Sequence, residues 1–162
     1  MFSSNASQVS NDVKYIEDVC SVYLRTGTGS SQTVTTGIKE NTGALVISKS
    51  RSAATDWAWY DTFRGATYDL VSNSTAAQTT QSQGLTSFNT DGHTWGTLAK
   101  VNTSGATYVD TVLKPTPKFF DVVTWTGNGV AGRQIPHNLG SVPACIIVKN
   151  LELGTDWIVY HR

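Results

Sequence analysis

The chain has 162 residues, 39% of them hydrophobic and only 15% charged, and its 12 basic residues balance its 12 acidic ones. This length allows one globular domain with a real core, or one domain and a fragment of another. A net charge of zero argues against nucleic acid as a partner, because phosphate binding needs a basic patch, and against an anionic membrane surface. Hydroxyl and amide side chains must therefore supply most of the polar surface.

The first 18 residues are predicted to form an N-terminal arm, because residues 1–11 are polar and poor in hydrophobic side chains. Val13, Ile16 and Cys20 fit either a short helix or an extended segment. The N-terminus lacks the basic and apolar regions of a signal peptide, and no apolar run is long enough to span a bilayer. We therefore expect synthesis in a cytoplasm and no membrane insertion.

Short β-type segments separated by turn residues follow the arm. They are rich in β-branched and aromatic side chains, and no stretch sustains apolar residues at helical spacing. Turns every 8–12 residues or so are typical of an antiparallel β-sandwich, of jelly-roll or lectin-like type. The predicted strands span residues 22–24, 32–36, 44–47, 57–60, 68–71, 85–88, 93–95 and 106–113.

A six-residue motif occurs twice. Residues 55–60 read Thr-Asp-Trp-Ala-Trp-Tyr, and residues 155–160 read Thr-Asp-Trp-Ile-Val-Tyr. The segment before it, Ala44–Lys49, also returns one hundred positions later as Ala144–Lys149. A period of this size indicates repeated domains and not a solenoid.

This repeat divides the chain. We assign a first β module to residues 19–113, a proline-rich linker to residues 114–118 and an incomplete second module to residues 119–162. Either the chain belongs to a longer protein, or the partial module completes its sheet by pairing with a neighbouring subunit, because an unfinished sheet has open edges. The cysteines, Cys20 and Cys145, do not occupy matched positions in the two modules, so we expect buried thiols and no disulfide.

The repeated aromatic side chains allow two interpretations. Trp59, Trp57 and Asp56 could form a carbohydrate-binding platform, with rings against the apolar sugar faces and the carboxylate accepting from hydroxyls. Repeated aromatic residues at strand spacing are more often core. Trp59 is the most site-like because Val159 replaces it in the second copy. The predicted module-core residues are Trp157, Tyr160, Tyr60, Ile47 and Ile147.

No motif indicates a metal, a cofactor or an enzyme. The histidines, His93, His137 and His161, have no metal-ligand spacing. The acidic residues are scattered singly, unlike a calcium loop. The sequence contains neither a nucleophile elbow nor a phosphate-binding glycine loop followed by a helix. We expect no catalytic residues, no metal ligands, no cofactor and no enzymatic activity.

The chain resembles a repeated module found in virion structural proteins of tailed phages that infect marine bacteria and cyanobacteria. The resemblance extends from about Val19 to Arg162 and leaves out the arm. In the first copy it rests on residues 49–56, 64–67, 91–92 and 104–109, and in the second on residues 121–129, 135–143, 146–149, 156–157 and 159–162.

This resemblance implies a virion location and a tail-fibre or tail-associated structural role. The expected partners are other virion proteins, at a tail adaptor or nozzle or on the capsid, together with further copies of the chain, most plausibly in a trimer. Two alternatives are a capsid decoration or cement protein and a carbohydrate-binding module that recognises a host surface glycan. The resemblance brings no catalytic residues with it.

Overall fold

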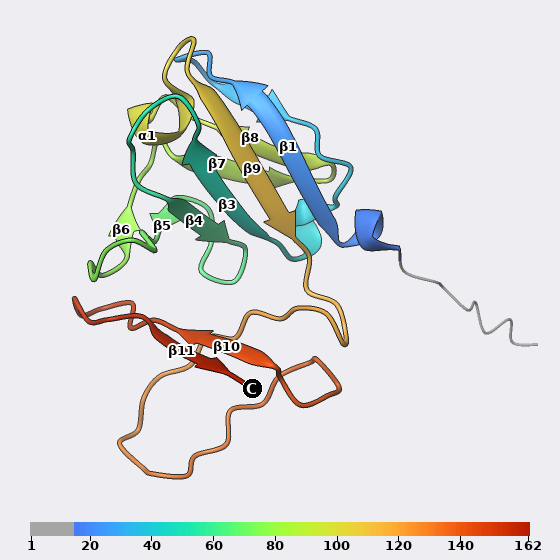
Figure 1. Ribbon diagram of the computed structural model, residues 1–162, viewed down its shortest axis with the longest axis vertical. Helices are drawn as coiled ribbons and strands as arrows, with labels where there is room; N and C mark the ends of the chain where they lie inside the picture. The colour runs from blue at the N-terminus through green and yellow to red at the C-terminus, as the bar shows by residue number, and fades with distance from the viewer. Residues whose placement is uncertain (1–14) are drawn as a thin grey trace, which may run out of the picture.

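The computed structural model describes residues 15–162, so the predicted arm lies outside the described residues except for residues 15–18. The short 3-10 helix η1 (Ile16–Asp18) leads into the first strand. The described chain is all-β, with antiparallel pairing and no closed barrel, which confirms the predicted sandwich-like fold class. Figure 1 shows the packed sheets and, apart from them, a hairpin that ends at the C-terminus.

The larger sheet has the order β1-β9-β3-β4 and consists of β1 (Cys20–Thr26), β9 (Thr107–Leu113), β3 (Leu45–Ser50) and β4 (Ala58–Asp61). β9 pairs along its whole length with β1, from Cys20 opposite Leu113 to Thr26 opposite Thr107. On its other side β9 pairs with β3, from Leu45 opposite Leu113 to Ser50 opposite Tyr108. The sheet therefore depends on pairing between segments that are far apart in the sequence.

The smaller sheet has the order β2-β8-β7 and consists of β2 (Gln32–Val34), β8 (Gly92–Trp95) and β7 (Leu85–Asn89). Alternate residues of β9 are buried, as expected for a strand with one face on a core. The two sheets and the loops between them enclose a core of Val34, Ile38, Ala44, Val46, Ala58, Tyr60, Leu85, Trp95, Val101 and Val112.

Smaller elements complete the first copy: η2 (Glu40–Thr42), β5 (Tyr68–Asp69), β6 (Thr79–Thr80) and α1 (Ala99–Asn102). A bridge between Trp59 and Leu70 places β5 beside the outer edge of β4. The loop that joins β5 to β6, residues 70–78, therefore lies at this edge. It is the surface against which the second copy packs.

Gly92 is required where β7 turns into β8. Its φ of +96° is a conformation that glycine adopts readily and other residues rarely do. Its N–H donates to the Ile38 carbonyl at 2.9 Å. An added Cβ would lie 1.9 Å from the Val34 carbonyl oxygen. The backbones of β2 and of the β7–β8 turn can approach this closely only with glycine here.

The second copy forms one hairpin, β10 (Cys145–Val148) and β11 (Ile158–His161). Its register repeats that of β3 and β4: Val46 lies opposite Tyr60, and Ile146 lies opposite Tyr160. The flanking backbone repeats as well, since Thr62 N–H donates to Ala44 and Arg162 N–H donates to Ala144. The sequence repeat is therefore a structural repeat at this hairpin.

Other elements of the first copy have no counterpart among the described residues of the second. Residues 120–126 and 132–134, which correspond to β1 and β2, form no strand. In the first copy these strands pair with β9 and β8, whose counterparts would lie beyond Arg162. β3 and β4 need only each other, so their counterparts still pair.

Neither cysteine forms a disulfide within the described chain. The expectation that both thiols are buried is wrong for Cys145, which is exposed, whereas Cys20 is half-buried. The physical reason is that, in residues 15–162, no strand besides β11 pairs with β10, on which Cys145 lies.

Candidate functional site at the junction of the two copies

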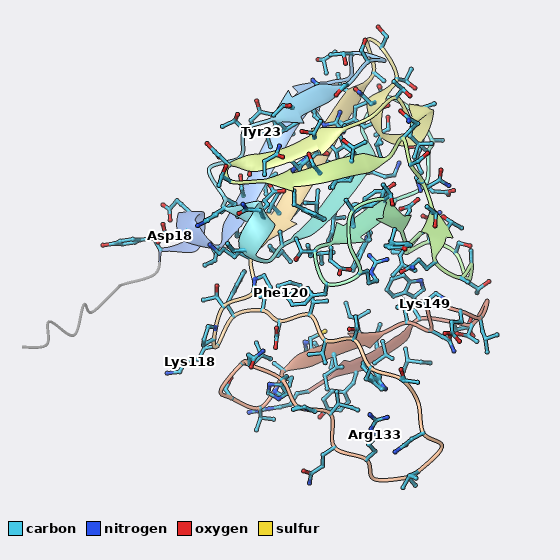
Figure 2. The ribbon with its side chains drawn as sticks, turned by 180° about the vertical axis from the view of Figure 1, so that it is seen from behind. Asp18, Tyr23, Lys118, Phe120, Arg133 and Lys149 are labelled. Carbon is cyan, nitrogen blue, oxygen red and sulfur yellow. The ribbon has the colours of Figure 1, made fainter. Side chains whose placement is uncertain are left out.

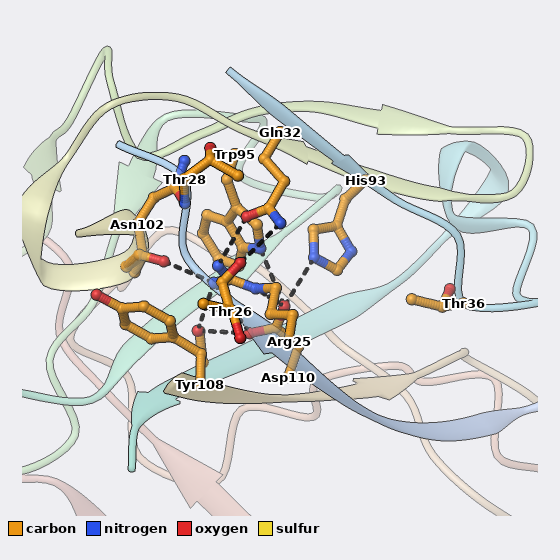
Figure 3. Close-up of polar contacts among 12 residues, drawn as sticks. Arg25, Thr26, Thr28, Gln32, Thr36, His93, Trp95, Asn102, Tyr108 and Asp110 are labelled. Carbon is orange, nitrogen blue, oxygen red and sulfur yellow. Dashed lines mark hydrogen bonds and ion pairs between the residues drawn. The ribbon is translucent and has the colours of Figure 1, made fainter. Parts of the chain in front are cut away.

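A charged cluster lies in the core of the first copy (Figure 3). The Arg25 guanidinium is sandwiched between the rings of Trp95 and Tyr108, 5.0 and 4.5 Å from their centroids. Its Nε donates to Asp110 at 2.6 Å. The same carboxylate accepts from the Ser48 hydroxyl at 2.6 Å and the Trp95 indole at 3.0 Å. These bonds satisfy a buried ion pair that would otherwise be costly.

His93 extends this cluster to a second carboxylate. Its Nε2 lies 3.4 Å from Asp110, and its Nδ1 lies 3.0 Å from Glu40. Burial alone would lower the pKa of the imidazole, but hydrogen bonds and charge from Asp110 and Glu40 outweigh it and raise that pKa. Burial would likewise raise the pKa of Asp110, but His93 and Arg25 lower it to about 2.

The cluster has residue types common in active sites, but it is closed to ligands. Each of its charged side chains is at most 7% exposed. No substrate can contact these atoms while the sheets remain packed. The cluster therefore serves the fold: it joins β1, β3 and β9 to β8 and to the segment that carries Glu40.

An accessible site forms where the second copy contacts the first. The rings of Trp59 and Trp157 meet with centroids 5.5 Å apart at an interplanar angle of 59°. The Trp157 indole donates to the Ser74 carbonyl at 3.0 Å. Trp59 is half-buried, and no hydrogen-bond acceptor meets its indole nitrogen in the described structure.

Backbone groups of the loop at residues 74–78 provide the other junction contacts. The Lys149 ammonium donates to the carbonyls of Thr75, at 3.0 Å, and Thr155, at 2.8 Å. The Gln78 N–H donates to the Leu151 carbonyl at 2.9 Å. Figure 2 labels Lys149 at this contact between the hairpin and the first copy. Most of these hydrogen bonds use backbone groups of the loop. The junction therefore depends on the loop's backbone conformation more than on its side chains.

An open cavity of about 500 Å³ lies beside these contacts. Its walls are hydroxyl and amide groups from the first copy and an aromatic and an acidic side chain from the second: Ser72, Asn73, Ser74, Thr75, Asp156 and Trp157. The corresponding carboxylate of the first copy, Asp56, instead accepts from the Asn73 amide at 2.7 Å. Asp156 is exposed at the cavity wall. The arrangement brings an indole side chain and a carboxylate acceptor to the same open cavity.

The predicted carbohydrate-contact residues lie near this junction but do not line the cavity. Trp57 is 39% exposed, its backbone N–H donates to the Asn73 side-chain oxygen, and Trp59 contacts Trp157. The cavity is instead lined by the second copy's Asp156 and Trp157. Sequence reasoning missed this because the two copies meet only in space.

The predicted core residues divide between the copies. Tyr60 is fully buried and Ile47 is half-buried, whereas Trp157 is half-buried at the junction. Ile147 and Tyr160 are 49% and 54% exposed, so the prediction that they are core is wrong for this chain. The physical reason is that no sheet of the described residues lies opposite β10 and β11. The same residue types therefore remain at the surface.

No group of three or more His, Cys, Asp and Glu side chains is placed to hold a metal ion within residues 15–162. In the same part of the chain, no helix is long and apolar enough to cross a membrane.

Comparison with known families places the chain in one of them. A family described as "Domain of unknown function (DUF7483)" matches residues 16–116 and again residues 109–162. The chain therefore belongs to this family, whose model matches it twice. No curated protein and no solved structure matched the chain.

Proposed function

We propose that this chain is a structural protein of a phage virion, a tail-fibre or tail-associated component that assembles as a homo-oligomer and contacts other virion proteins. The observation that carries the proposal is the second hairpin. It repeats the register of β3 and β4, but among the described residues its apolar faces are exposed and neither of its outer strand edges is paired. Proteins rarely leave such edges free, because they pair with other strands.

The composition supports an assembled particle component. Its surface is rich in hydroxyl and amide groups and carries no net charge. The repeat joins two copies through the contact between Trp59 and Trp157 and backbone hydrogen bonds. Repeated units that contact only their neighbours can form an extended structure from one type of folding unit. The resemblance to phage virion modules supports the proposed location in a virion.

The copy number of the chain per particle tests this proposal. Quantitative mass spectrometry of purified virions, scaled to the major capsid protein, should give a few to tens of copies. Hundreds of copies would instead identify a capsid decoration or cement protein. Absence of the chain from purified particles would contradict a virion role altogether.

Carbohydrate recognition is a second candidate function, favoured by the junction cavity. A tryptophan ring beside a carboxylate and several hydroxyl and amide groups is a chemically suitable surface for a sugar. Asp156→Asn should weaken glycan binding on an array by about tenfold, as expected for the loss of a charged hydrogen bond. Glu17→Gln is the control, because Glu17 is an exposed carboxylate on η1 and does not line the cavity. Equal binding by both variants would contradict the site.

A further inference from the structure

A lysine and a buried aspartate are held in contact inside the first copy. Lys100 lies on α1 and Asp69 lies on β5, 31 positions apart in the sequence, and the Lys100 ammonium donates to Oδ2 of Asp69. The Asp69 side chain is 1% exposed and the Lys100 side chain is 18% exposed. The fold of the first copy therefore brings an amine and a carboxyl group together in a place that is largely closed to water.

This ion pair differs from the others in the nature of its cation. The other ion pairs within residues 15–162 use the guanidinium of Arg25 or Arg64, or the imidazole of His93. Among these groups only a primary amine is a nucleophile that forms a stable amide with a carboxyl group. Lys100 supplies the one such amine that contacts a carboxylate in the described part of the chain.

The surroundings of Asp69 favour the uncharged forms of the pair. Its second oxygen, Oδ1, is buried and has no hydrogen-bond partner in the described structure. Burial raises the pKa of the Asp69 carboxyl, and this effect outweighs the opposing effects of Lys100 and Arg64. Arg64 is itself committed to Asp61, at 2.5 Å, and to the Trp59 carbonyl, at 3.0 Å. A buried carboxylate with an unsatisfied oxygen is costly, so proton transfer within the pair is favoured.

We propose that Lys100 and Asp69 form an isopeptide bond, an amide that joins Nζ of Lys100 to Cγ of Asp69. The ammonium first transfers a proton to the carboxylate, and the resulting amine attacks Cγ. The Nζ–Cγ bond forms and one Cγ–O bond breaks. The departing oxygen leaves as water, with the transferred proton and a second proton from Nζ. The reaction needs no oxidant or other reactant, and the two opposite charges disappear together.

The bond would remove both charges from the buried site and leave only one carboxyl oxygen to be satisfied. It would also close a covalent loop that contains β6, β7 and β8 and fasten β5 to α1. A cross-link of this kind stabilises a fold by restricting the unfolded chain, as a disulfide does. Since β5 leads into the loop at residues 70–78, the bond would fix the surface against which the second copy packs. This inference does not rest on the proposed virion role.

Mass spectrometry of the purified, denatured chain tests the proposal. We expect a mass that is lower by one water molecule than the mass given by the sequence. Cleavage after aromatic residues should then release two joined peptides, one containing Asp69 and the other Lys100. Phe88 and Trp95 lie between these two residues, so after cleavage the peptides stay together only through the cross-link.

Lys100→Arg is the decisive variant, because it keeps a cation beside Asp69 but provides no amine. Its mass should equal the mass given by its own sequence, and no joined peptides should appear. Lys39→Arg is the matched control, since Lys39 is exposed and forms no ion pair within the described residues. This control should lose one water molecule, as the natural chain does. If Lys100→Arg fails to fold, the joined peptides of the natural chain still decide the question.

Three results would overturn the inference. They are a natural chain whose mass equals that of its sequence, a loss of water that persists in Lys100→Arg, and joined peptides that link residues other than Lys100 and Asp69. The second result would mean that the chain is dehydrated elsewhere, for example by cyclisation of an aspartate onto its own backbone. None of these results depends on the number of copies in a virion, so the failure of the cross-link and the failure of the virion role can be told apart.

Discussion

The two copies share a hairpin and differ in almost everything around it. β3 and β4 lie within a sandwich, with β9 on one edge and a second sheet over their inner face. β10 and β11 have the same register, but in the described part of the chain they have neither of these neighbours. The comparison separates what the local sequence specifies from what long-range pairing supplies. The local sequence determines the register of the hairpin, whereas β1 and β2 form only where β9 and β8 are present to pair with them.

The largest expected difference between the copies is in hydrogen exchange. Amides of β3 should open only with global unfolding, at about 5 kcal/mol or more, whereas an isolated two-stranded hairpin is marginally stable. Since each 1.4 kcal/mol is about tenfold, β3 should exchange at least about a thousandfold more slowly than β10. Residue-resolved exchange by NMR would measure this. Comparable protection would show that β10 is covered in solution.

Removing the buried charge of the first copy should strongly destabilise it. Asp110→Asn leaves the Arg25 guanidinium without its counter-ion in the core. Breaking a buried pair in this way typically costs about 3–5 kcal/mol. Chemical denaturation followed by tryptophan fluorescence would give the change in the free energy of unfolding. Asp156→Asn, an exposed carboxylate of the second copy, is the control and should change it by less than about 0.5 kcal/mol.

The pH dependence of stability should also come from the first copy. The raised pKa of His93 gives a stabilising contribution that is present below its unfolded pKa of about 6.5 and is lost as pH rises through the folded value. The lowered pKa of Asp110 gives a contribution that is present above about 3.9 and is lost as pH falls towards about 2. Stability should be greatest between these limits.

The variant His93→Gln separates the two ends of this profile. It should abolish the loss of stability on the alkaline side, because no imidazole remains to deprotonate. It should reduce the loss on the acidic side without abolishing it, because Arg25 still lowers the pKa of Asp110. Thermal unfolding at a series of pH values would show it. An unchanged alkaline limb would mean that another group controls it.

The smallest effect is expected at the junction. Trp157→Ala removes the ring contact with Trp59 and the bond to Ser74. An aromatic pair is worth about 0.5–1.5 kcal/mol beyond its buried area. Hairpin amides should therefore exchange up to about tenfold faster, while global unfolding of the first copy stays the same. Trp57→Ala is the matched control, since Trp57 does not take part in this aromatic contact.

Sequence reasoning predicted the fold class because the relevant signals are local. Alternation along residues 106–113 and the turn at Asp91 and Gly92 each indicate a strand or a hairpin without reference to distant residues. The repeat also predicted that residues 144–160 would resemble residues 44–60. The strand order was not predictable, since β9 lies between β1 and β3 through contacts that no local pattern encodes.

The buried charges were missed although a signal was present. Asp110 stands between Tyr108 and Val112 on the inward positions of β9, and Arg25 occupies an inward position of β1. A charged residue in the apolar phase of a strand indicates a partner of opposite charge in the core. What the sequence does not contain is which partner, because Arg25 and Asp110 lie far apart in the chain. The junction cavity was missed for the same reason.

The shared register has a consequence for how genes of this kind can change length. An in-frame crossover between the codons for Val46 and Ile146 would delete one hundred residues and join β3 to the second copy's turn without shifting any strand pair. The reverse event would insert a whole copy. Chains of this family should therefore vary in length by steps of about one hundred residues, with the crossover points inside the hairpin.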